Sequence, residues 1–595
     1  MAESIISPGV YARENDISFI QPAPVAAGAA FIGPTVKGPD NQPLIVTSYS
    51  DYVRKFGETF TSASSTYEFQ TSIAVKSYFQ QGGQTALVTR VLSGSYTTAT
   101  NTFISASAKG STEPFNIVTL GRGAMYNNAT SSLHGLGALT ASIFNSDGSL
   151  VSGSADNLRW EIANVNSTLG TFSLIVRQGN DSTNNKTVLE TFNDLSLDPN
   201  SANYVEAVVG NQYVTVVTDS TSGVSYNSLI GTYPNRSNYI RVSGVNLATP
   251  NYLSTDGVSV NLDSAGLSYS ASLPVSSSGS FFGAGGVVKS GAKYFGSVNN
   301  VSTDIQGLVA ANYTTAVSLL SNKDDFQFNI ISTPGLIYSN TAAYAGGKTV
   351  LDSIIALAEN RGDCIAVVDL VPTGSALTAV TGQAVTLNSS YAATYWPWVQ
   401  VQSATGKNEY IPAGTIIPGV FAFTDAASAP WFAPAGLVRG GLPGVIQAER
   451  KLTKGERDTL YAGKVNPIAS FPGTGISVFG QKTLQTKASA LDRVNVRRLL
   501  IALKKFVGDQ ARNLVFEQNT ITTRNKFLAT VNPYLESVVQ RQGLYAYRVI
   551  MDDSNNTADS IDRNQLNGQI LIQPTKTVEF VVLDFTIAPT GATFG

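Results

Sequence analysis

The sequence predicts a multidomain α/β and α+β chain, in which a large all-β region interrupts a core built from the N- and C-terminal parts. Three observations lead to this prediction. The chain has 595 residues, more than a single core usually holds. Helical and strand-like patterns alternate toward both ends, whereas the middle shows short alternating stretches among Gly, Ser, Asn and Asp turns. Apolar residues make up 43% of the chain, enough to bury several cores.

Residues 26–95 form the first part of the predicted α/β domain. Short strands broken by Gly33-Pro34 precede a helical face that runs from Tyr67 to Phe79. An apolar strand, Ala86 to Leu92, follows directly. A helix that leads into a buried strand is typical of an α/β layer.

Residues 311–435 form the second part of the same discontinuous domain. Residues 326–330 alternate as a strand does, a helical pattern runs to Asn360, and Cys364 to Val371 is an unbroken apolar run. A fully apolar strand suits a sheet that is covered on both faces. We expect this strand–helix–strand unit to share a core with residues 26–95.

Residues 96–310 form the predicted inserted all-β region, with a division into two subdomains as an open alternative. Its strand candidates include Tyr213 to Val217 and Val258 to Leu262, each bounded by turn residues. Residues 264–288 carry no charge at all.

Residues 436–575 form the predicted C-terminal domain, which contains a long amphipathic helix, a second helix near 524–542, and strands at 545–551 and 569–571. The apolar face of the long helix is made by Val496, Leu499, Leu500, Leu503, Phe506, Val507 and Leu514. Its basic residues Arg493, Arg497, Arg498, Lys504, Lys505 and Arg512 outnumber its acidic ones in a chain with only 13% charged residues.

The two ends of the chain, residues 1–25 and 576–595, read as extended arms. Prolines block helix in the first arm, where Val10 and Tyr11 favour a strand. In the second arm, the strand-like run contains Val578, Phe580 and Val582. The alternative is that both are frayed termini or strands of their own domains.

Composition excludes several classes of function. The net charge of −2 gives no general support for direct nucleic-acid binding. One cysteine, Cys364, and one histidine, His134, argue against a disulfide framework and against a zinc or copper site. No run of 18 apolar residues and no signal region occur, so we expect a protein made in a cytoplasm without membrane insertion.

No motif for catalysis or cofactor binding is found, so we expect neither a cofactor nor an enzyme. The glycine cluster at 283–286 lacks the lysine of a phosphate-binding loop. Arg361-Gly-Asp363 spells an adhesion tripeptide, but it lies where Gly362 suits the end of a helix. Asp324-Asp325 lacks the spacing of a calcium loop. Carboxylates that are distant in the sequence but paired for glycoside hydrolysis remain an open alternative.

Two groups of short motifs occur in a set order near the two ends of the chain. The first group is Ser7-Pro-Gly-Val-Tyr11, Ala30-Phe-Ile-Gly-Pro34, Lys37-Gly-Pro39, Val46-Thr-Ser-Tyr-Ser-Asp51, Phe56-Gly57 and Tyr78-Phe-Gln-Gln-Gly-Gly83. The second group is Pro434-Ala-Gly436, Arg439-Gly440, Asn466-Pro-Ile468, Gly475-Ile476, Gly480-Gln-Lys-Thr-Leu484, Asn495-Val-Arg-Arg-Leu499, Phe516-Glu-Gln-Asn519 and Glu579-Phe580. In this order they resemble the contractile phage tail sheath family, with Lys482 as one departure, where the family more often has arginine.

The resemblance implies a structural subunit that polymerises as stacked hexameric rings around a tail tube. The implied sheath is metastable when extended and contracts by rigid-body rearrangement to drive the tube through a cell envelope. The implied partners are other copies of the chain, the tube protein, and baseplate and tail terminator proteins. The implied location is the virion tail, assembled in the host cytoplasm, with the 96–310 region facing outward.

Two roles follow for particular residues. The arms, through Val10, Tyr11, Val578, Phe580 and Val582, would add strands to a neighbour's sheet. The basic helix would face the tube through Arg493, Arg497, Arg498, Lys504 and Lys505, although a solvated helix face or ion pairs within the domain would explain these residues equally well.

Two alternatives stay open. The first is the sheath of a bacterial contractile bacteriocin or injection device. The second, from another class, is a β-rich tail component that binds or hydrolyses carbohydrate. Binding of a sugar surface by the 96–310 region is compatible with either case.

Overall fold

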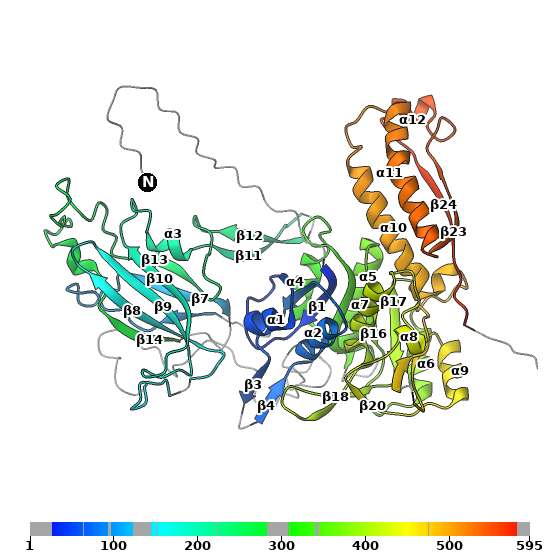
Figure 1. Cartoon of the computed structure of the whole chain (residues 1–595), viewed down its shortest axis with the longest axis horizontal. Helices are drawn as coiled ribbons and strands as arrows, with labels where there is room; N and C mark the ends of the chain where they lie inside the picture. The colour runs from blue at the N-terminus through cyan, green and yellow to red at the C-terminus, as the bar shows by residue number, and fades with distance from the viewer. Residues whose placement is uncertain are drawn as a thin grey trace, which may run out of the picture.

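The computed structural model describes residues 27–62, 65–92, 97–122, 144–151, 153–221, 223–282, 308, 310–339, 344–473 and 475–579. The predicted arm residues Val10, Tyr11, Phe580 and Val582 therefore lie outside the described residues. So do His134 and the glycine cluster at 283–286. The described part is a mixture of helices and sheets in several units, as the sequence predicts (Figure 1).

The main unit is built on an eight-stranded sheet with the order β2-β5-β1-β15-β16-β17-β21-β22. The six central strands run parallel, and an antiparallel strand closes each edge. The strands are β1 (Ala27–Gly33), β2 (Leu44–Val46), β5 (Ala86–Arg90), β15 (Phe328–Ile337), β16 (Ile365–Asp369), β17 (Ala392–Trp396), β21 (Asn466–Phe471) and β22 (Gly475–Val478).

Segments from distant parts of the sequence meet at the centre of this sheet. Strand β1 pairs in parallel with β15, and Ala30 stands opposite Ile331. Every residue of β16 is buried, which fits a strand covered on both faces. The boundary that the sequence suggests at 435/436 falls inside this sheet, because β21 and β22 come from beyond it.

Helices cover both faces of the main sheet. One face packs against α1 (Tyr49–Phe56), α2 (Gln70–Gln80) and α7 (Ile417–Ala427). The opposite face packs against α4 (Ala311–Leu319), α5 (Ala345–Arg361), α6 (Leu377–Val385) and α9 (Lys454–Ala462). The alternation of side chains along β1 divides the two cores, with Phe31 on the first face and Ile32 on the second.

A second, β-rich unit is made from residues 98–282 and lies at the opposite end of the molecule from the C-terminal helices (Figure 1). Its antiparallel sheet has the order β10-β9-β8-β14-β6-β7-β13 and one core around Trp160 and Phe172. The strands are β6 (Thr98–Asn101), β7 (Phe115–Arg122), β8 (Leu158–Asn166), β9 (Thr171–Gln178), β10 (Val188–Ser196), β13 (Ile240–Val245) and β14 (Ser277–Phe282). A short helix, α3 (Val205–Val209), also belongs to it, so the unit is not purely β.

One predicted strand of this region is wrong. Val258 to Leu262 forms isolated bridges instead of a strand. The side chains of Asp256 and Asp263 accept hydrogen bonds from the backbone N–H groups of Val258 and Leu267, at 2.9 and 2.8 Å. These local bonds hold the segment in successive turns, which compete with pairing in a ladder.

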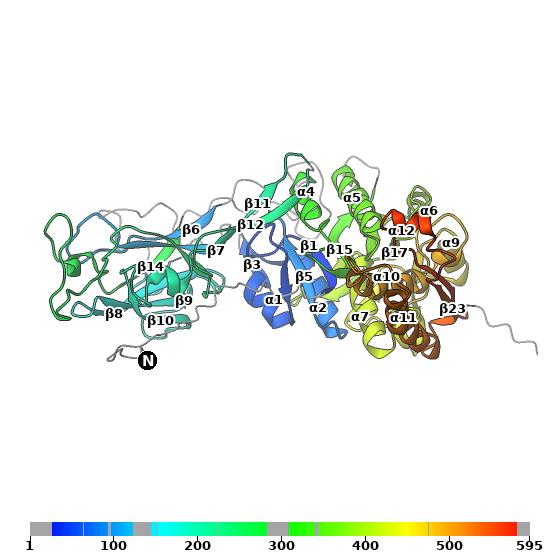
Figure 2. The same cartoon turned by 90° about the horizontal axis from the view of Figure 1, so that it is seen from above.

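A two-stranded hairpin, β11 (Tyr213–Thr218) and β12 (Ser225–Ile230), reaches from the β-rich unit toward α4 (Figure 2). The backbone N–H of Ser225 donates to Oγ of Ser318, which directly follows Val317 in that helix, at 2.9 Å. The hairpin thus contributes to the contact between the two units.

The C-terminal unit stands on one side of the main sheet and has a core of its own (Figure 1). It contains α10 (Val494–Arg512), α11 (Ile521–Gln540), β23 (Leu544–Ile550), α12 (Ala558–Asp562) and β24 (Gln569–Pro574), which confirms both predicted helices and both strands. Smaller elements are β3 (Thr59–Ser62), β4 (Ser65–Glu68), β18 (Val399–Gln402), β19 (Asn408–Ile411), β20 (Val445–Ala448) and α8 (Gly436–Arg439). No helix in the described ranges is both long and apolar enough to span a membrane.

Candidate functional site

The basic helix predicted from the sequence is α10, and two of its arginines point into the protein. Arg497 and Arg498 are 4% and 3% exposed. Arg498 forms an ion pair with Asp425 at 2.5 Å, and its guanidinium lies 4.6 Å from the ring centre of Phe421. Arg497 lies 3.9 Å from the ring centre of Tyr391, and burial lowers its pKa.

The prediction that Arg497 and Arg498 form an exposed, tube-facing surface is therefore wrong. Both residues hold α10 against the main unit, because Asp425 belongs to α7 and Tyr391 immediately precedes β17. Sequence reasoning placed them correctly on a helix. It could not identify the partners Asp425 and Tyr391, which lie 73 and 106 positions away in the sequence.

The two lysines further along α10 are more accessible. Lys504 is exposed, and its Nζ donates to Oη of Tyr391 at 3.3 Å. Lys505 is half-buried and lines a cavity of about 290 Å³ together with Phe506 and Asp509. These two lysines are the members of the predicted basic surface that the fold leaves near solvent.

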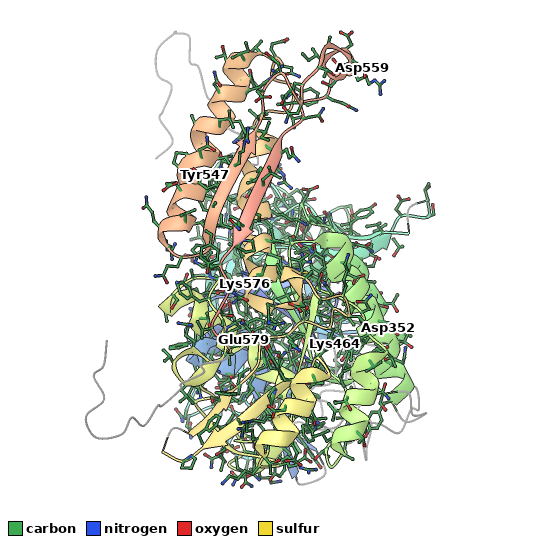
Figure 3. All side chains as sticks on the ribbon, turned by 90° about the vertical axis from the view of Figure 1, so that its right-hand side faces the viewer. Asp352, Lys464, Tyr547, Asp559, Lys576 and Glu579 are labelled. Carbon is green, nitrogen blue, oxygen red and sulfur yellow. The ribbon has the colours of Figure 1, made fainter. Side chains whose placement is uncertain are left out.

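Arg493 holds the beginning of the C-terminal arm. Its Nε and Nη2 contact the two carboxylate oxygens of Glu579 at 2.7 and 3.0 Å, and Gln481 donates to the same carboxylate at 3.1 Å. Burial disfavours the charged form of Glu579, but the bonds from Arg493 and Gln481 outweigh burial and lower its pKa. Figure 3 shows Glu579 and Lys576 at the base of the C-terminal unit.

The segment from Thr575 to Glu579 is extended, and its side chains alternate between those that hydrogen-bond to the protein and those that are exposed to solvent. Thr575 donates to the carbonyl oxygen of Gln542 at 2.8 Å, and Gln481 donates to Thr577 at 2.5 Å. Lys576, between Thr575 and Thr577, and Val578, between Thr577 and Glu579, are exposed. Val578 is 80% exposed, so its side chain has no place in the core of its own subunit.

This segment borders a wide cavity of about 1370 Å³ between the C-terminal unit and the main unit. The lining combines aromatic and basic side chains, including Phe432, Phe479, Tyr545, Arg439 and Arg457. The guanidinium of Arg457 lies 5.2 Å from the ring centre of Phe471 and 5.9 Å from that of Phe479. A groove of this character suits a partner chain with apolar side chains.

The hairpin of β23 and β24 above the groove is a sheet with open edges. Within the described part of the chain, the two strands pair with each other and with no third strand. Tyr545 and Leu571 are 62% and 47% exposed. Unpaired strand edges beside exposed apolar side chains can accept a further strand from another chain. The sequence predicts these strands but contains no signal that their edges stay open.

The other singled-out motifs have structural roles. Arg361 forms an ion pair with Asp363 at 2.8 Å, and Gly362 ends α5 in a left-handed conformation with φ of 68°. Burial raises the pKa of Cys364 to about 12, as expected for a core thiol. Among the described residues, no group of three or more His, Cys, Asp or Glu side chains could hold a metal ion.

Comparison with known proteins finds two protein-family models that match parts of the chain. A model described as the phage tail sheath protein central domain matches residues 306–484, and one described as the phage tail sheath C-terminal domain matches residues 486–588. Over these residues the chain is similar to the contractile phage tail sheath family. The matched residues cover β15 to β22 of the main sheet and the whole C-terminal unit.

Individual sheath proteins are similar over part of the chain. The tail sheath protein of Vibrio phage KVP40 is 32% identical over 318 residues, 48% of this chain and 47% of that protein. The tail sheath protein of Enterobacteria phage T4 is 32% identical over 265 residues, 42% of this chain and 40% of that protein. The match thus spans less than half the length of these curated relatives. A sheath tail protein from Listeria innocua is similar with a TM-score of 0.48 and 10% identity, covering 89% of this chain and 90% of that one.

Proposed function

We propose that this chain is the structural subunit of a contractile tail sheath and not an enzyme. The observation that carries the proposal is the match of two sheath domains, in order, over residues 306–588. The subunits polymerise as stacked hexameric rings around a tail tube in the virion tail, after assembly in the host cytoplasm. Their partners are other copies of the chain, the tube protein, and the baseplate and tail terminator proteins.

The arms connect the subunits in this proposal. Residues around Val10 and Tyr11, and those around Val578, Phe580 and Val582, add strands to the open edges of the β23–β24 hairpin of neighbours. Support comes from the exposure of Val578 and from the extended segment that Arg493 anchors through Glu579. Backbone hydrogen bonds between strands hold two bodies together while leaving their relative orientation free to change.

The proposed domain organisation follows the sheets. Arms are placed at 1–25 and 576–595, an α/β domain at 26–95 with 311–435, an outward-facing insertion at 96–310, and a C-terminal domain at 436–575. The strands β21 and β22 join the main sheet, which favours moving the start of the C-terminal domain to the approach to α10.

The proposed contact with the tube uses fewer residues than the sequence suggests. Lys504 and Lys505 face the tube, whereas Arg493, Arg497 and Arg498 hold the subunit itself together. Exposed ion pairs contribute about 0–1 kcal/mol each, so such a contact can release when the sheath contracts. Contraction is a relaxation between two packings of rigid bodies and needs no bound nucleotide.

Electron microscopy of the full-length chain tests the proposal. Negative staining of the purified protein should show striated hollow cylinders of uniform diameter. Monomers or trimers that bind saccharide and never form cylinders, even with the tube protein present, would contradict it.

A further inference from the structure

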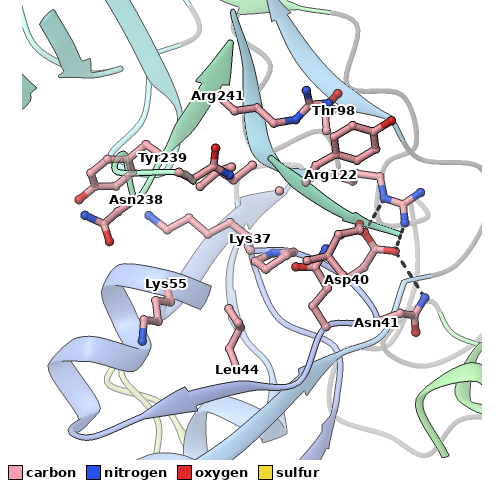
Figure 4. Close-up of a pocket in the computed structure, with 18 of the residues that line it drawn as sticks. Lys37, Asp40, Asn41, Leu44, Lys55, Thr98, Arg122, Asn238, Tyr239 and Arg241 are labelled. Carbon is pink, nitrogen blue, oxygen red and sulfur yellow. Dashed lines mark hydrogen bonds and ion pairs between the residues drawn. The ribbon is translucent and has the colours of Figure 1, made fainter. Parts of the chain in front are cut away.

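A deep cleft separates the β-rich unit from the main unit. Its volume is about 940 Å³, near the upper end of the range for small-ligand sites. Figure 4 shows Thr98, Asn238, Tyr239 and Arg241 on the side of the β-rich unit, and Lys37 on the side of the main unit. The hairpin β11–β12 contributes further lining through Tyr213 to Val216.

Positive charge gathers in this cleft, although the whole chain is slightly acidic. The lining contains five cations, Lys37, Arg54, Lys55, Arg122 and Arg241, but two carboxylates, Asp40 and Asp156. Asp51, just outside the lining, pairs with Arg54 and Lys55 at 2.6 and 2.9 Å. The positive charges therefore remain in excess when this third carboxylate is counted.

Four of the five cations are already paired. Arg122 binds both carboxylate oxygens of Asp40 at 2.6 and 2.7 Å, and Lys37 lies 3.3 Å from Asp156. Both pairs join the β-rich unit to the main unit across the cleft. They fix the walls of the cleft, so its shape does not depend on a ligand.

Arg241 is the exception. Its guanidinium lies 4.2 Å from the ring centre of Tyr213, and within the described residues it makes no ion pair and no side-chain hydrogen bond. Burial lowers the pKa of Arg241, so the protein environment disfavours its charge. Five buried arginines of this chain do reach a carboxylate, namely Arg159, Arg177, Arg361, Arg498 and Arg524, whereas the half-buried Arg241 reaches none among the described residues.

The binding partner that suits the Arg241 guanidinium is an oxyanion. A guanidinium that stacks on an aromatic ring keeps its N–H edge free for two parallel hydrogen bonds to a carboxylate or phosphate. The remaining lining is rich in amides and hydroxyls, including Gln212, Asn238 and Thr98, which suit the hydroxyl groups of a sugar.

We propose that this cleft binds a sugar that carries a carboxylate or a phosphate, and that Arg241 receives the oxyanion. Of the residues that line this cleft, Thr315 alone lies within the ranges that match the sheath domains. The paired walls around Lys37 and Arg122 provide a rigid receptor, which lowers the entropic cost of binding.

Calorimetric titration of the full-length chain tests the proposal with D-galacturonate, galactose 6-phosphate, D-galactose and inorganic phosphate. At least one acidic sugar should bind, and D-galactose should bind at least about tenfold more weakly, because a hydrogen-bonded charge is lost. Equal binding of D-galactose, or no binding of either acidic sugar, would overturn it. If inorganic phosphate binds as tightly as galactose 6-phosphate, the cleft does not recognise the sugar, and the proposal of a sugar site is overturned.

Two variants locate the site. Arg241→Gln should lower the affinity for the acidic sugar about tenfold or more. Arg236→Gln removes the same charge from an exposed position outside the lining and should bind normally. Equal loss in both variants would reveal general charge attraction and overturn the assignment.

Hydrogen exchange of the unmodified protein provides a readout that does not depend on the folding of any variant. The acidic sugar should slow exchange of the backbone amides in residues 37–44 and 235–241. Binding without protection in these two segments would place the ligand elsewhere and contradict the proposal.

Discussion

Single residues show how the protein uses its few charges. Arg498 and Asp425 form a largely buried pair between α10 and α7. Burial raises the pKa of Asp425, although Arg498 acts in the opposite direction. A pair of this kind specifies which helices meet, and its loss leaves an uncompensated charge in the core.

Replacing Arg498 by Glu should lower the free energy of unfolding by about 3–5 kcal/mol, because two carboxylates would then meet in a buried site. Urea denaturation followed by circular dichroism measures this change. Lys504→Glu, on the exposed side of the same helix, is the matched control and should change stability by less than about 0.5 kcal/mol. Equal stability of the two variants would refute the structural role assigned to Arg498.

Asp369 gives the protein a pH-dependent stability. This carboxyl is buried at the end of β16, where it accepts a hydrogen bond from the backbone N–H of Gly414 at 2.8 Å, and burial raises its pKa to about 7. The folded state therefore binds a proton that the unfolded state releases above its ordinary pKa of 3.8.

Its contribution to stability should be complete below about pH 4 and lost as the pH rises to about 7. Asp369→Asn keeps an acceptor for Gly414 but cannot ionise. The difference in unfolding free energy between the natural chain and this variant, measured by urea denaturation from pH 4 to pH 8, should grow in favour of the variant. A difference that stays constant with pH would contradict the assignment.

At the scale of elements, the start of α10 contacts the C-terminal segment that ends at Glu579. Arg493 occupies the N-cap position of α10 and holds Glu579 through two bonds. Thr575 and Thr577 are anchored on the same side, which turns Lys576 and Val578 outward. The helix start thus holds the described part of this segment, residues 575–579, against the subunit.

Glu579→Gln should loosen the arm without unfolding the domain, since a partly exposed ion pair contributes little to global stability. Hydrogen exchange should accelerate at residues 575–579, and cylinders should form less readily in electron micrographs. Asp559→Asn breaks an exposed pair with Arg563 on α12 and should change neither measurement. Unchanged exchange at 575–579 in the Glu579 variant would show that the pair does not hold the arm.

At the scale of the whole molecule, the described residues form three packed units with cores of their own. The main sheet joins residues on both sides of the β-rich unit, so that unit extends from the body without interrupting its core. Ion pairs such as Arg122–Asp40 link it to the main unit. Rigid bodies with separate cores are what a contraction by rearrangement requires.

Deletion of residues 1–20 should leave a folded, soluble subunit that no longer forms cylinders, because the deleted residues precede β1 and its core. Circular dichroism checks the fold, and negative-stain microscopy with size-exclusion chromatography checks assembly, with the full-length chain as the control. Normal sheaths from the truncated chain would show that the N-terminal arm is dispensable.

The sequence alone determined the kinds of elements, much of their order and the family resemblance, because periodicity, turn residues and ordered motifs are local properties of the chain. It predicted α10, α11 and the strands of the C-terminal unit, but it misread Val258 to Leu262, where aspartate side chains close local turns. Only the tertiary structure decided that Arg497 and Arg498 are buried, that Arg493 binds Glu579, and that Arg241 lines a cleft without an ion-pair partner among the described residues. Burial and pairing depend on residues that are distant in the sequence, and the chain must fold before those residues meet.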